Sequence, residues 1–260
     1  MKKNIILIVS AMCLIGCWRV AESPMGALFV ESFVHRYVDF ENTFWEFDVT
    51  TKTLYMAVAD SRPDEASHAD CAYWMGSRCW DMECCQEQCL LYRQLSEKNN
   101  DTAYNRRIAK EEQFDIAAIG HNFTKIDIVS NADFDENHPA GCSLADMVML
   151  TYGTYKPYID SGYYEKHSAP WYYNLANNCT VKSAMLCDLG LSDLSVLRVK
   201  CFRKGVINNV KLNDDFQFTF ETLPTLEQQH TLDIVFVSDE DEEFRFKVDV
   251  DFAGSSNKEI

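Results

Sequence analysis

The strongest constraint on the fold lies near the carboxyl end, where hydrophobic and polar residues alternate. In EFRFKVDVDF, residues 243–252, phenylalanine and valine occupy every second position and charged residues mostly lie between them. Successive side chains of a β-strand point to opposite faces, so this period of two predicts an antiparallel strand with one buried face. Residues 216–223 and 231–238 also have the composition of strands. The acidic segment 239–242 between the last two predicts a hairpin turn.

Similar segments occur earlier in the chain. They are FWEFDV (44–49), KTLYMAVA (52–59), FTKIDIVS (123–130) and SVLRVKCF (195–202). Residues 83–113 contain neither glycine nor proline, and CLLYRQL and NRRIAKEEQF within them predict helical turns. Ser143 is expected to be the N-cap of another short helix, SLADMVMLTY. The predicted fold class is mainly β: an antiparallel, sandwich-like domain with a short helical, cysteine-rich insertion.

The amino end predicts export. Two lysines precede an apolar run from residue 5 to 15, which is too short to span a bilayer and is typical of a secretory signal. Leu14-Ile15-Gly16-Cys17 resembles the bacterial lipobox, in which the cysteine receives lipid, including palmitate-type acyl chains, and the signal is cut before it. The alternative is an ordinary signal peptide with an incidental cysteine. The resemblance implies a lipid anchor on Cys17, where several acyl chains hold a protein firmly to a membrane.

These features divide the chain into five parts. They are a lipoprotein signal peptide (1–16), a lipidated cysteine and tether (17–36), a single β-rich domain (37–252), a cysteine-rich and helical insertion within it (61–113), and a tail (253–260).

Charge narrows the range of partners. The chain has 24 basic and 40 acidic residues, a formal net charge of −16. Nucleic acid is bound through lysine and arginine that neutralise phosphates, so a nucleic-acid partner is excluded. The predicted contact with a membrane is therefore through the amino-terminal lipid and not through the folded part. Acidity otherwise favours solubility, cation binding or basic partners.

Nine cysteines remain once Cys13 and Cys17 are set aside, an odd number. In an oxidising envelope they would tend to form disulfides, and at least one would be free or pair between chains. The candidates for disulfides are Cys71, Cys79, Cys84, Cys85, Cys89, Cys179, Cys187 and Cys201.

No cofactor is predicted, although two segments contain metal-ligating residue types. For zinc these are His68, Cys71, Cys85 and Cys89, but a clean second C-x(2–4)-C pair is missing. For calcium they are Asp133, Asp135 and Asn137. An EF-hand would need glycine and glutamate where His138 and Leu144 stand, so that motif is excluded. The alternative for the second segment is a turn whose Asp and Asn side chains accept local backbone hydrogen bonds.

The segment from Ile126 to Leu144, IDIVSNADFDENHPAGCSL, resembles an uncharacterised Bacteroidota lipoprotein family in which a strand leads into DFDE-x-HPAG-x-SL. The resemblance implies an envelope location and a β-rich fold, and no activity. The chain departs from the family at Cys142 and in the cysteine cluster 71–89.

Two further expectations depend on that resemblance. Trp18-Arg19-Val20-Ala21 lacks the acidic residues that would accompany export to the outer surface, which implies an outer-membrane protein facing the periplasm. Asp101-Thr102-Ala103 matches the short O-glycosylation pattern of the phylum, so Thr102 is a candidate glycosylation site.

The chain contains no G-x-S-x-G, H-E-x-x-H or phosphate-binding glycine loop. The predicted function is therefore a non-enzymatic binding or structural lipoprotein, with a glycan or an envelope protein as partner. The alternatives are an envelope hydrolase with an unrecognised carboxylate site and a metal-binding protein using the 68–89 cluster. An aromatic-rich stretch could stack on sugars or form a packed loop. It contains Tyr152, Tyr155, Tyr158, Tyr163, Tyr164, Trp171, Tyr172 and Tyr173.

Overall fold

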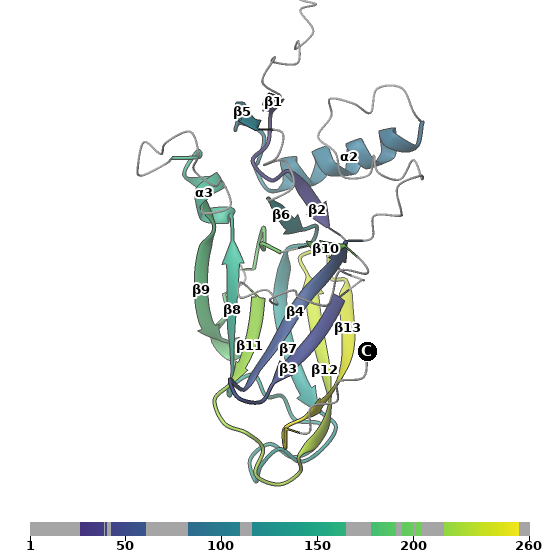
Figure 1. Cartoon of the computed structure of the whole chain (residues 1–260), viewed down its shortest axis with the longest axis vertical. Helices are drawn as coiled ribbons and strands as arrows, with labels where there is room; N and C mark the ends of the chain where they lie inside the picture. Colours follow the sequence, from purple (N-terminus) through teal and green to yellow (C-terminus); the bar gives the residue numbers. More distant parts are fainter. Residues whose placement is uncertain are drawn as a thin grey trace, which may run out of the picture.

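A computed structural model describes residues 27–38, 40, 43–60, 83–109, 116–164, 178–190, 194–199, 201–203 and 216–254. Within these residues the protein is mainly β, and its sheets are largely antiparallel. The strands of the two main sheets occupy the lower part of Figure 1, and the two α-helices lie at the upper end. The predicted fold class is confirmed, whereas residues 61–82 of the predicted insertion lie outside the described residues.

The larger sheet contains six strands. Its strands are β3 (Thr43–Asp48), β4 (Thr53–Asp60), β8 (Val148–Thr154), β9 (Thr180–Met185), β10 (Cys201–Arg203) and β11 (Phe216–Phe220). Strand β4 pairs with β3, β10 and β11, and the sheet continues from β11 to β8 and then to β9. All of these pairs are antiparallel except that of β10 with β4.

The smaller sheet contains three antiparallel strands in the order β13, β12, β7. They are β7 (Phe123–Ser130), β12 (Gln229–Ser238) and β13 (Glu243–Asp251). Strands β12 and β13 form the hairpin that the sequence predicts, with the acidic turn between them. The alternation in β13 is confirmed, because Val248 and Val250 are buried and Lys247 and Asp249 are exposed.

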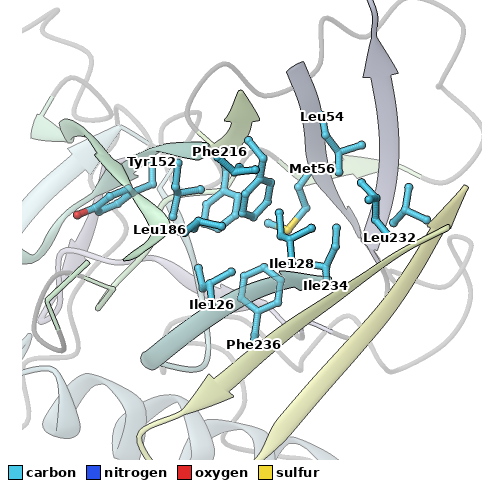
Figure 2. Close-up of a cluster of buried hydrophobic side chains, with 14 of the residues drawn as sticks. Leu54, Met56, Ile126, Ile128, Tyr152, Leu186, Phe216, Leu232, Ile234 and Phe236 are labelled. Atoms are coloured by element: carbon cyan, nitrogen blue, oxygen red, sulfur yellow. The ribbon is translucent and has the colours of Figure 1, made fainter. Parts of the chain in front are cut away.

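The two sheets enclose one hydrophobic core. Figure 2 shows Phe216 and Met56 of the larger sheet near Ile128, Ile234 and Phe236 of the smaller sheet. All five are fully buried, and the rings of Phe216 and Phe236 lie 6.2 Å apart. Burying each such side chain contributes roughly 1.5–3 kcal/mol, so this contact between the sheets stabilises the sandwich-like arrangement.

A second hydrophobic cluster lies at the upper end. The elements there are β1 (Ala27–Val30), β2 (Arg36–Val38), α2 (Glu83–Lys98), β5 (Arg106–Ala109), β6 (Ala117–Ile119) and α3 (Lys156–Asp160). Strand β1 pairs antiparallel with β5, and β2 pairs parallel with β6. Phe33 fills the centre, with the rings of Tyr104, Tyr155 and Tyr158 edge-on to it at 4.7–5.3 Å. This cluster joins the amino-terminal residues to the loop after β8.

Three local predictions from the sequence are wrong in whole or in part. Residues 106–109 form a strand and not a helical turn, because they pair with β1. Ser143 caps no helix: its hydroxyl donates to Asp127 Oδ1 at 2.6 Å, and Met147 leads directly into β8. In the segment 195–202 only the end belongs to a strand, while Leu197 makes an isolated bridge.

The folded region also begins before the end of the predicted tether. Strand β1 lies within residues 17–36, and Phe33 and Val34 are fully buried. Helix α2 and strands β3, β4, β7, β11, β12 and β13 are confirmed, with shifts of a few residues at some ends.

Candidate functional site

For most of the cysteines predicted to carry lipid, form disulfides or bind metal, the structure does not describe the side chain. Cys17, His68, Cys71 and Cys79 are outside the described residues. Helix α2 contains Cys84, Cys85 and Cys89, and β10 contains Cys201, with only the backbone described. Cys179 is half-buried against the upper cluster. Among the cysteines whose side chains the structure describes, Cys142 and Cys187 form no disulfide.

Cys187 is an exposed thiol, so the disulfide predicted for it is absent from this structure. It lies in the 3-10 helix η4 (Leu186–Asp188), with its side chain exposed to solvent. Desolvation and the neighbouring carboxylate of Asp188 raise the pKa of the Cys187 thiol. Cys142 is also an exposed thiol.

The predicted calcium ligands form a turn. The Oδ1 atom of Asp133 accepts the backbone N–H of Ala140 at 2.8 Å, and Oδ1 of Asp135 accepts those of Asn137 and His138 at 2.8 and 2.9 Å. Across the described residues, no three His, Cys, Asp or Glu side chains are arranged to hold a metal ion. These carboxylates therefore stabilise a turn, which is the alternative interpretation given for this segment.

His138 joins two carboxylates beside this turn. Its Nδ1 lies 2.8 Å from Asp135 Oδ1, and its Nε2 lies 3.1 Å from Asp146 Oδ1. Both ring nitrogens must carry hydrogen to donate to both carboxylates, which favours the imidazolium form. Partial burial lowers the pKa of His138, but the hydrogen bonds to Asp135 and Asp146 outweigh it and leave the pKa raised. The ion pairs hold the turn against the start of β8.

A buried serine–histidine pair lies near the same end of the molecule. Ser130 Oγ is 2.6 Å from His230 Nδ1, and His230 Nε2 is 2.9 Å from the carbonyl oxygen of Glu227. A carbonyl can only accept, so Nε2 carries the hydrogen, and the single hydrogen of the Ser130 hydroxyl is shared between His230 Nδ1 and the carbonyl oxygen of Ala132 at 2.9 Å. This contact resembles that of a nucleophile and its base. Ser130 and His230 are only 1% and 3% exposed, so substrate has no access and the pair is structural.

Asp101 is the centre of a buried polar network that the sequence did not predict. It is 0% exposed, and it accepts the backbone N–H groups of Phe33 and Val34, both at 2.7 Å, and the hydroxyl of Tyr163 at 2.9 Å. Burial raises the pKa of Asp101, although these hydrogen bonds act in the opposite direction. The adjacent Thr102 is exposed. The network fixes the loops of the upper cluster, and Thr102 remains a predicted glycosylation site.

The described part of the aromatic-rich stretch is mainly a packed region. Tyr152, Tyr155, Tyr158 and Tyr163 are at most 7% exposed, because their rings fill the two hydrophobic clusters. Only Tyr164 is open to solvent among its described members, at 71%. Trp171, Tyr172 and Tyr173 lie outside the described residues.

The outer surface of the larger sheet has no charged residue in the rows that cross its central strands. Strand register aligns one row from β4 to β9: Tyr55, Gln217, Thr151 and Ser183. A neighbouring row contains Thr53, Thr219, Met149 and Met185. These eight residues alternate with the core positions and therefore lie on the opposite side of the sheet, where all but Thr53, which is 4% exposed, are at least partly open to solvent. We call them the uncharged face.

Hydroxyl pairs link neighbouring strands across the uncharged face. Thr151 Oγ1 lies 2.8 Å from Ser183 Oγ, and Thr53 Oγ1 lies 3.1 Å from Thr219 Oγ1. Acidic residues appear only on the edge strand β3, where Glu46 is paired with Tyr55 and Asp48 with Thr53.

The outer surface of the smaller sheet, by contrast, is rich in charged residues. Its strands present Lys125, Asp127, Asp233, Glu243, Arg245, Lys247, Asp249 and Asp251. Arg245 reaches Asp233 at 3.2 Å and Glu243 at 2.9 Å. Charged side chains of this kind keep an exposed sheet solvated and discourage association. The two outer surfaces of one sandwich therefore differ sharply in charge.

Comparison of the chain with family models, curated proteins and solved structures finds no match. No helix in the described stretches is long and apolar enough to cross a membrane. The function must therefore be argued from the chemistry of these surfaces and from the amino-terminal sequence.

Proposed function

We propose that this protein is a non-enzymatic binding module of the bacterial cell envelope, anchored by lipid on Cys17, and that its partner docks on the uncharged face. The observation that carries the proposal is the segregation of charge between the two sheets. In a chain with a net charge of −16, four neighbouring strands present two rows without a charged residue. The centres of protein interfaces are depleted of charge in the same way.

The location rests on the amino-terminal sequence. The lipobox favours a lipid anchor, and the resemblance of residues 126–144 to a Bacteroidota lipoprotein family favours the cell envelope. The residues Trp18-Arg19-Val20-Ala21, which lack acidic side chains, favour the outer membrane with the protein facing the periplasm. Strand β1 lies at the upper end of the molecule in Figure 1, away from the loops at the lower end. An anchor a short distance before β1 would leave the outer surfaces of both sheets accessible to other envelope components.

The binding face is tested by photo-crosslinking in the native host. A benzophenone amino acid replaces Gln217 in the full-length chain, and the matched control places it at Lys247 on the outer surface of the smaller sheet. Irradiation of intact cells is expected to yield a higher-mass adduct at position 217 and none at 247. Equal adducts at both positions, or none at 217, would show that the uncharged face is not the binding surface.

The anchor is tested separately. Cells fed an alkyne-labelled palmitate are expected to label the wild-type chain, and Cys17→Ser is expected to abolish the label and release the protein from the membrane fraction. Cys142→Ser is the control, because that cysteine lies in the folded domain and should leave labelling unchanged. Persistent labelling of Cys17→Ser would rule out this anchor.

A further inference from the structure

We infer that the occupant of the uncharged face is an uncharged polysaccharide; this inference rests on the proposed binding role of that face. Its first support is the polar row formed by Tyr55, Gln217, Thr151 and Ser183, which crosses the strands from β4 to β9. With neighbouring strands about 4.8 Å apart, the row extends for about 14 Å. This length suits a short stretch of an extended chain of sugars lying across the strands.

The chemistry of the row matches that of sugar hydroxyls. Hydroxyl and carboxamide groups both donate and accept hydrogen bonds, as sugar hydroxyls do. When Thr151 and Ser183 pair at 2.8 Å, one hydroxyl donates to the other, and the pair still has one donor and free acceptor lone pairs. The pair that Thr53 and Thr219 form at 3.1 Å has less capacity, because Thr53 donates its hydrogen to the carbonyl oxygen of Thr51 and Thr219 then donates to Thr53. Groups already held by a neighbour lose little freedom when a ligand binds.

The neighbouring row supplies apolar contact for the C–H faces of sugar rings. Met149 is 36% exposed and lies opposite Met185 in the register of β8 and β9. Methionine is flexible and polarisable, so it adapts to irregular apolar surfaces. The ring of Tyr55 combines an apolar body with a hydroxyl, which suits a surface that is partly polar and partly apolar.

Charge excludes the other polymers. A net charge of −16 repels acidic polysaccharides and nucleic acid. A basic protein would be drawn to carboxylates, which are concentrated on the other sheet and on the acidic turn 239–242. A peptide strand would add to an open sheet edge, where main-chain groups are free, and not to a face. Of the polymers that a charge-free face could bind, an uncharged, hydroxyl-rich one best matches the hydroxyl and carboxamide groups of the polar row.

The test analyses the adduct captured at position 217 of the full-length chain in its native host. The attached material is expected to resist proteinase, to be degraded by periodate, which cleaves vicinal diols, and to leave the isoelectric point of the chain unchanged. Thr151→Lys is expected to lower the adduct yield at least about tenfold, because a lysine charge would be desolvated beneath the ligand. Thr231→Lys, the same change on the smaller sheet, is expected to leave the yield unchanged.

The outcomes separate the inference from the proposed function. An adduct that proteinase removes would identify a protein partner, and one that shifts the isoelectric point toward acid would identify an acidic glycan. Either result overturns the inference and leaves the binding face intact. A full yield from Thr151→Lys would also overturn it. Absence of any adduct would overturn both the inference and the proposed function.

Discussion

Replacing Phe134 by alanine tests whether the loop after β7 is anchored on the hydrophobic core. Phe134 is fully buried although it lies in a turn-rich, polar segment. Its ring stacks on that of Phe220 at a centroid distance of 6.0 Å and an angle of 14°, and it meets Phe252 edge-on at 5.5 Å. The side chain therefore closes the lower end of the core.

The expected cost follows from these contacts. Truncation of a buried phenylalanine to alanine costs about 3–5 kcal/mol, and loss of the aromatic pairs places Phe134→Ala in the upper part of that range, about 4–5 kcal/mol. For a domain of this size the midpoint of thermal unfolding should fall by about 8–20 °C.

The assay is urea unfolding of the purified protein followed by circular dichroism. Glu136→Ala is the control, because Glu136 is exposed in the same loop and its replacement should change stability by less than about 0.5 kcal/mol. A loss below about 1 kcal/mol for Phe134→Ala would refute the argument, since it would mean that the loop does not pack on the sandwich.

Three other predictions concern polar groups. Desolvation opposes both shifts, but the ion pair between His138 and Asp135 leaves the pKa of His138 raised and the pKa of Asp135 lowered. The ion pair should therefore stabilise the fold fully between about pH 4 and 6.5. Its contribution should fall as the pH rises through the pKa of His138 or drops through the pKa of Asp135. His138→Gln should remove this dependence from urea midpoints measured from below about pH 4 to above about pH 6.5; an unchanged profile would contradict it. Asp101→Ala leaves two backbone N–H groups without their acceptor and should lower the free energy of unfolding by about 2–4 kcal/mol in urea titrations, with a loss under about 1 kcal/mol counting against the network. Asp188→Asn should speed alkylation of Cys187 by iodoacetamide, measured by peptide mass mapping, because the carboxylate raises the thiol pKa; equal rates would oppose this.

Local patterns predicted six strands of the sandwich, but β8 lies in a segment predicted as a helix and β9 was not predicted. The alternation in residues 243–252 and the β-branched and aromatic run in 123–130 specify strands by themselves, because side chains two apart share one face. They failed for residues 106–109, whose composition favours a helix. That segment is a strand because β1, far away in sequence, provides its hydrogen-bond partners.

The binding face could not be predicted in the same way. Tyr55, Gln217, Thr151 and Ser183 are scattered over the chain and meet only through strand pairing. The described tyrosines of the aromatic stretch, for which the sequence left both sugar stacking and loop packing open, mostly fill the hydrophobic clusters. Asp101 likewise shows no signal in the sequence, since its partners, two backbone N–H groups and the Tyr163 hydroxyl, are more than sixty residues away.

The sequence alone determined the class of secondary structure and the expectation of export, because both depend on short-range order: the period of side chains along a strand, and an apolar run before a cysteine. Only the tertiary structure decided which residues share a surface. Sheet register depends on contacts between distant segments, and it placed the uncharged residues on one side of the sandwich and the charged residues on the other.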